Sequence, residues 1–127
     1  MIDVRKQIHY WQNGAEEELL NARIMIENKR ILAGLFFCHL CVEKIFKALV
    51  VKVTEEHPPR THNLFLLAEK ALIVLDKEQD KFASELQVYQ LEGRYPETMP
   101  SEPKDMKLVE EYYKNTENFH LWLKAKL

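Results

Sequence analysis

The segment ILAGLFFCHLCVEKIFKALVVKV, residues 31–53, decides the fold of this chain. At about 100° per residue, most of its apolar side chains fall on one arc, which is typical of a buried helix. The residues on this arc are Ile31, Leu35, Cys38, Val42, Ile45, Leu49 and Val53. His39, Glu43 and Lys47 follow at intervals of four residues on a second arc that is otherwise apolar. A water-filled cleft, a partner subunit over this face, or pairing among the charges would each explain ionisable groups in such surroundings.

Helical periodicity continues on both sides of this segment. Residues 4–26 carry an apolar stripe, and the polar residues 28–30 then form a short connection, so we expect an antiparallel helical hairpin. Two further helices are predicted over about residues 64–75 and 76–91, the first capped by Thr61 and the second by a capping box of Asp76 and Gln79. The first of these has a predicted buried face, which comprises Leu64, Leu67, Ala68, Ala71, Leu72 and Leu75.

The remainder of the chain fits the same pattern. Residues 93–105 hold three prolines and a glycine and are predicted to be a loop, and a last helix runs from about residue 104 to the C-terminus. No segment has the alternation of a strand bounded by hairpin turns, so the sequence predicts an all-α bundle.

Length and charge indicate one ordinary globular domain. A chain of 127 residues supplies one core and not two, so we expect a single domain over residues 1–127. A formal net charge of −2 gives no overall attraction to phosphate, so a contact with nucleic acid needs a local basic patch, and we expect no DNA binding. The first twelve residues lack the apolar core of a signal peptide, and the charges within residues 31–53 oppose insertion into a bilayer. We therefore expect a cytoplasmic protein without membrane contact.

The two cysteines do not predict a metal or redox site. Cys38 and Cys41 have CxxC spacing, but a zinc site needs a second pair of ligands, and a redox pair usually opens a helix. Cys38 is predicted to be a core residue, and Cys41 either the same or a free thiol. The chain has no glycine-rich phosphate loop, no HExxH motif and no nucleophile elbow, so we expect no metal and no cofactor.

Three groups of residues suggest a binding site, and each has an ordinary structural alternative. On the segment 31–53, Glu43, Lys44 and Lys47 would line a cleft or an interface, or Glu43 and Lys47 would form a solvated pair worth about 0.3–0.5 kcal/mol. In GRYP, residues 93–96, Arg94 would grip a phosphate while Tyr95 stacks on a base, or the segment would be a turn with a surface arginine.

The third group lies in HPPRTHN, residues 57–63. Its prolines stiffen the link, and Arg60 and His62 precede a helix N-terminus, so these residues would contact phosphate. The alternative is a polar link in which Thr61 or Asn63 caps the helix.

The order of these motifs resembles that of the HEPN domain family (higher eukaryotes and prokaryotes nucleotide-binding). A first helix with Trp11 and AEE at 15–17 is followed by FCHLCVEKIFKAL at 37–49, PPRTHNL at 58–64 and GRYPE at 93–97. The family carries related E-K-x-x-K-A-L, T-H-x-L and R-Y-P stretches. The resemblance covers nearly the whole chain and implies a four-helix up-and-down bundle with an additional short or C-terminal helix, usually a homodimer.

The resemblance also implies a function. Such proteins are often encoded beside a minimal nucleotidyltransferase in toxin–antitoxin pairs, and many are metal-independent ribonucleases that use an R-x4–6-H motif. Here the next histidine after Arg94 is His120, so that motif is not present in its usual form and we assign no catalytic residue. Either His62 or His39, brought close in space, would have to supply an acid or base.

We therefore expect a HEPN-like homodimer that binds a nucleotide or RNA between the helix 31–53, the link 57–63 and the loop 93–96. In this hypothesis Arg94 and Lys47 contact phosphate, Tyr95 offers a stacking face, His62 forms a hydrogen bond and Glu43 holds the lysine.

Two alternatives remain open. In the first, the chain is a protein-interaction module that docks a nucleotidyltransferase through Phe36 and Phe46, on the apolar flank of the segment 31–53, and holds no nucleotide. In the second, it is a metal-independent ribonuclease with a non-standard histidine.

Overall fold

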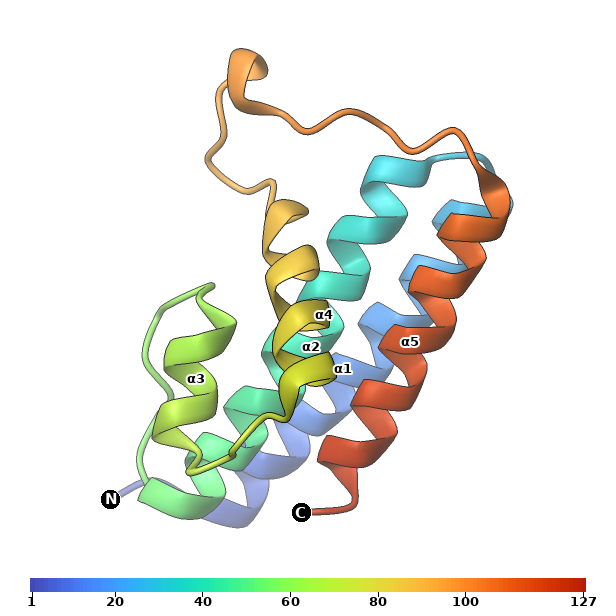
Figure 1. The fold of residues 1–127 in the computed structure, drawn as a ribbon. Coiled ribbons are helices and arrows are strands. Elements are labelled where there is room, and N and C mark those ends of the chain that lie inside the picture. The colour runs from blue at the N-terminus through green and yellow to red at the C-terminus, as the bar shows by residue number, and fades with distance from the viewer.

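The computed structural model describes residues 1–127, and all of its regular structure is helical. The elements are α1 (Val4–Glu27), α2 (Ile31–Thr54), α3 (Leu64–Lys70), α4 (Lys77–Val88), the 3-10 turn η1 (Pro96–Thr98) and α5 (Met106–Lys124). Helices α1, α2, α4 and α5 alternate in direction, and the short α3 lies beside them (Figure 1). The predicted all-α bundle with a C-terminal helix is confirmed.

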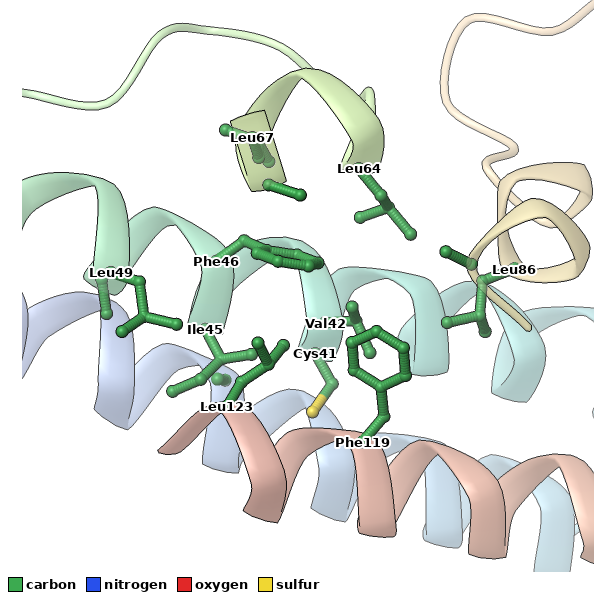
Figure 2. Close-up of a cluster of buried hydrophobic side chains, with 14 of the residues drawn as sticks. Cys41, Val42, Ile45, Phe46, Leu49, Leu64, Leu67, Leu86, Phe119 and Leu123 are labelled. Atoms are coloured by element: carbon green, nitrogen blue, oxygen red, sulfur yellow. The ribbon is translucent and has the colours of Figure 1, made fainter. Parts of the chain in front are cut away.

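Helix α2 is the centre of the bundle, because α1, α3, α4 and α5 all pack against it. The predicted apolar arc is buried except for Val53 in the last turn, which is 43% exposed. Phe46 is fully buried and its ring packs edge-on against Phe119, with 6.0 Å between centroids (Figure 2). The hypothesis that Phe46 docks a partner is therefore wrong, since Phe46 belongs to the core.

The predicted hairpin of α1 and α2 is confirmed, and the two helices approach closely at one point. The turn at residues 28–30 includes Lys29 in the left-handed region, with φ of 63°. A Cβ on Gly34 of α2 would lie 2.6 Å from Cγ1 of Ile26 on α1. Only glycine allows this contact without a shift of the neighbouring atoms.

Helix α3 differs from its prediction at both ends. Asn63, and not Thr61, is the N-cap, because the Asn63 side chain accepts hydrogen bonds from the backbone N–H groups of Phe65 and Leu66. The helix ends at Lys70, and Leu72 adopts a left-handed φ of 57° and is 76% exposed. The prediction that Leu72 is buried is therefore wrong.

Helix α4 begins as predicted and ends early. Its capping box of Asp76 and Gln79 is present, with both reciprocal hydrogen bonds formed. The helix stops at Val88, and residues 89–105 run as a long connection that extends away from the bundle before α5 (Figure 1). The predicted loop contains one short helical turn, η1. None of the helices combines the length and the apolar character needed to cross a membrane.

Candidate functional site

The carboxylate of Glu43 lies inside the protein and gathers partners from two segments of the chain. Glu43 is 3% exposed, and its Oε2 accepts a hydrogen bond from Lys47 Nζ at 3.0 Å. Its Oε1 lies 2.9 Å from Nδ1 of His62, which precedes α3, and 3.7 Å from Nδ1 of His39. Because a buried carboxylate needs such partners, Glu43 ties the link 57–63 to α2.

Lys47 points inward. The residue is 6% exposed, and its ammonium lies between the carboxylate of Glu43 and the indole of Trp11, 5.2 Å from the ring centroid. A cation over an aromatic face is favourable, so this burial is compensated on two sides. The structure does not bring Lys47 to a surface where it could contact phosphate as predicted, although Glu43 holds it as expected.

His62 connects this interior pair to the surface. Its side chain is 41% exposed, with Nδ1 directed at Glu43 and Nε2 at Oε2 of Glu92, 3.4 Å away. Since a carboxylate oxygen only accepts hydrogen bonds, the 2.9 Å contact is one in which Nδ1 donates to Glu43. Glu43 thereby fixes the orientation of the imidazole and leaves Nε2 on the outer side.

A cavity of about 420 Å³ lies beside His62. Its lining comes from the end of the link 57–63, from α3, from α4 and from the turn after α4. The lining residues are His62, Asn63, Phe65, Gln87, Gln90 and Arg94. The fold thus brings together His62 and Arg94, which the sequence analysis placed at one site from two separate motifs.

Arg94 both shapes the turn after α4 and faces the cavity. Its Nε donates to the Gln90 carbonyl at 2.8 Å, and Nη1 donates to the Thr98 carbonyl at 2.8 Å. Nη2 makes no hydrogen bond within the chain. The guanidinium is therefore held in place by two backbone acceptors and retains donors for a ligand.

The other predicted site residues lie elsewhere. Lys44 Nζ pairs with Glu18 Oε2 of α1 at 2.9 Å. Arg60 is exposed on the link, and Tyr95 is 71% exposed; neither lines the cavity. The aromatic ring at the cavity is that of Phe65, and not that of Tyr95 as expected.

The N-terminus of α3 does not supply the predicted phosphate contact. Asn63 Oδ1 accepts the N–H groups of Phe65 and Leu66, and Gln87 Oε1 accepts that of Leu64 at 2.6 Å. The alternative from the sequence, a link whose Asn63 caps the helix, is the arrangement observed. The first N–H groups of the helix are therefore already bonded and do not face an anion.

Among the histidines named as acid–base candidates, only His62 is accessible. His39 is fully buried, and removal of its ring from water lowers its pKa from 6.5 to about 4, although Glu43 acts in the opposite direction. Neither of its ring nitrogens has a hydrogen-bond partner. His120 on α5 is 2% exposed, and burial lowers its pKa as well. Neither residue lines the cavity.

Both cysteines are core residues. Cys38 and Cys41 are free and fully buried, and loss of hydration raises the pKa of Cys38 to about 11 and that of Cys41 well above its ordinary value. Cys41 is therefore a core residue, as Cys38 is, and also a free thiol. No group of three or more His, Cys, Asp and Glu side chains is arranged to hold a metal ion.

The sequence analysis missed five residues of the site. Phe65, Gln87 and Gln90 line the cavity, Glu92 faces His62 Nε2, and Asn63, expected only as a helix cap, lines the cavity as well. The glutamines belong to no motif, and Phe65 resembles any other apolar residue of a helix. Glu92 and Asn63 carried a signal, since Glu92 directly precedes the GRYP segment and Asn63 lies in the link 57–63.

Comparison with known proteins gives one result that covers the chain. No curated protein and no solved structure gives a significant match. The model of the HEPN domain matches residues 8–126, which include α1 from its fifth residue on, every later element and every residue that lines the cavity. This chain is therefore a member of the HEPN domain family.

Proposed function

We propose that this HEPN domain binds a nucleotide or RNA through a phosphate group in the cavity between His62 and Arg94. Membership in the family relates the chain to nucleotide- and RNA-handling domains. The observation that carries the proposal is the meeting of His62 and Arg94 at one cavity, with each side chain held from behind. Donors that are fixed before the ligand arrives lose little entropy on binding.

The chemistry of the cavity fits a nucleotide. Arg94 supplies a permanently charged donor, and arginine is well suited to phosphate oxygens. Phe65 provides an aromatic face against which a base can stack. The side chains of Asn63 and Gln87 both use their oxygens to accept hydrogen bonds from the backbone of α3, which points the amide nitrogen of Asn63, and in part that of Gln87, to other partners. These N–H groups suit ligand oxygens.

Titration of the purified protein with labelled ATP, GTP and a short RNA tests this proposal. Arg94→Ala should weaken binding about tenfold, the scale of one hydrogen bond to a charged group. Because Arg94 also anchors the turn after α4, His62→Gln serves as a second variant that leaves those two bonds in place. Arg5→Ala, on the first turn of α1, makes the same charge change away from the cavity and should bind as wild type. Unchanged affinity in both cavity variants, or no binding by wild type, refutes the proposal.

We further propose that the domain acts as a homodimer and as the partner of a minimal nucleotidyltransferase in a toxin–antitoxin-type pair. Both proposals rest on the family resemblance of the motifs. Sedimentation of the purified chain tests the first. Co-expression with the product of a neighbouring nucleotidyltransferase reading frame, followed by co-purification, tests the second, and two separately eluting proteins would contradict it.

A second candidate function is metal-independent cleavage of RNA with His62 as the non-standard histidine. The observation in its favour is the contact between His62 Nδ1 and Glu43, since a carboxylate that orients an imidazole is typical of an acid–base residue. Incubation of RNA with the protein in EDTA decides this. Cleavage should survive chelation and be lost in His62→Gln and in Arg94→Ala, while intact RNA with wild type excludes it.

A further inference from the structure

The imidazole of His62 lies between two carboxylates of unlike surroundings. Nδ1 faces the buried Glu43 at 2.9 Å, and Nε2 faces Glu92 at 3.4 Å. The Glu43 side chain is 4% exposed, whereas that of Glu92 is 62% exposed. Glu43 therefore belongs to the fixed interior, and Glu92 is an anionic group on the solvent side of the same ring.

The backbone of Glu92 is held in this position by the side chain of Gln90. Glu92 N donates to Gln90 Oε1 at 2.8 Å, and Gln90 Nε2 donates to the Glu92 carbonyl at 3.1 Å. Arg94 then bonds the Gln90 carbonyl and closes the turn. Two cavity residues, Gln90 and Arg94, thus fix the backbone of the segment that carries Glu92, whose carboxylate lies 3.4 Å from His62 Nε2.

We propose that Glu92 is a built-in competitor for the anion site. Its carboxylate takes the place beside His62 Nε2 that a ligand phosphate would take, so an incoming anion must first displace it. This inference rests on the proposed function and describes how the same cavity is regulated. Any factor that neutralises Glu92 or draws it away, such as a cationic group on a partner protein, would raise the affinity of the cavity for phosphate.

The mechanism has a quantitative consequence. The energy needed to separate Glu92 from His62 is the same for every ligand that occupies the site, so removal of the Glu92 charge should raise all affinities by a common factor. Because this contact between Glu92 and His62 is partly exposed, the factor should be about two- to fivefold. A change confined to one ligand would instead indicate a specific contact.

The test uses Glu92→Gln, which retains the side-chain shape and removes the charge. Affinities for AMP, GMP and a short labelled RNA are measured in wild type, in Glu92→Gln and in Glu97→Gln. Glu97 is exposed in η1 and is not within ion-pair distance of His62, so its variant controls for net charge. Glu92→Gln should strengthen binding of all three ligands by the same factor, and Glu97→Gln should not. The ¹⁵N signal of His62 Nε2 should also change in unliganded Glu92→Gln.

The outcomes separate this inference from the proposed function. If Arg94→Ala and His62→Gln weaken binding while Glu92→Gln does not strengthen it, the competitor role is wrong and the binding site stands. If Glu92→Gln and Glu97→Gln raise the affinity equally, the gain comes from the change in net charge, and the inference is also overturned. No binding in any of the proteins refutes the proposed function itself.

Discussion

Exchange of Glu43 for leucine should destabilise this fold strongly, because it leaves a buried cation alone. Lys47 is 6% exposed, and Glu43, at 3.0 Å, is the only carboxylate within ion-pair distance of its ammonium. At this separation the Coulomb attraction is about 5 kcal/mol for an effective dielectric constant of about 20, and desolvation of the two charges offsets much of it. When the carboxylate is removed, Lys47 still bears the cost of its desolvation but no longer has the Coulomb attraction to Glu43. We therefore expect the free energy of unfolding to fall by about 3–5 kcal/mol.

The partner variant and the double variant make the prediction specific. Lys47→Met should cost only about 2 kcal/mol, since the carboxylate keeps its contact with His62 and methionine replaces the apolar stem of lysine. Glu43→Leu combined with Lys47→Met should unfold within about 1 kcal/mol of wild type, because apolar residues often replace a buried ion pair without loss. The two single losses are thus expected not to add.

Urea unfolding of the four proteins near neutral pH, followed by circular dichroism, measures these values. With a slope of about 1–3 kcal/mol per molar urea, the Glu43→Leu midpoint should fall by about 2 M relative to wild type. Additive losses in the double variant, or a loss below about 1 kcal/mol for Glu43→Leu, would show that the two charges are not buried against each other.

Three further predictions follow from the core. Because the folded interior holds the pKa of His39 at about 4 rather than 6.5, the unfolded chain binds a proton that the folded chain does not, and stability should fall by up to about 3 kcal/mol as the pH drops from 6.5 to 4. Urea midpoints at a series of pH values measure this, and His39→Gln should flatten the dependence. Gly34→Ala should cost about 1–3 kcal/mol in thermal unfolding, since its Cβ would meet Ile26 at 2.6 Å; a wild-type melting temperature would contradict the contact. Neither Cys38 nor Cys41 should react with a thiol reagent until denaturant is added, and rapid labelling of the native protein would refute their burial.

The helices could be predicted from the sequence, but several of their ends could not. Apolar spacing located α1, α2 and α5 because each buries one face or more against the bundle. The end of α3 was missed because the chain turns there without glycine, with Leu72 at a left-handed φ of 57°. Glu55 adopts the same φ after α2, but that helix ends at Thr54, one residue from its predicted end. A left-handed conformation is unfavourable for a residue other than glycine, and tertiary packing offsets this energy. The local sequence therefore does not indicate where such a turn occurs.

The site was predictable only in part. The spacing of Glu43 and Lys47 placed them on one face of a helix, and that pair is formed. Spacing could not show that the pair turns inward, because burial depends on which segment covers the face. Spacing also could not show that two nitrogens of Arg94 donate to backbone carbonyls. The path of the turn after α4 depends on such tertiary contacts and not on a periodic pattern in the sequence.

The buried pair of Glu43 and Lys47 is better explained by its role in positioning His62 than by a contribution to stability. Replacing Glu43 and Lys47 together with apolar residues should leave the fold about as stable, so the charges are not needed to hold α2 in the core. An apolar pair would, however, remove the hydrogen-bond acceptor for His62 Nδ1. The imidazole ring, which lies on the non-helical link 57–63, would then lose its fixed orientation. The double variant should therefore keep its unfolding midpoint and lose phosphate binding. This dissociation would separate a positioning role for Glu43 from a merely structural one, and parallel loss of both would argue against it.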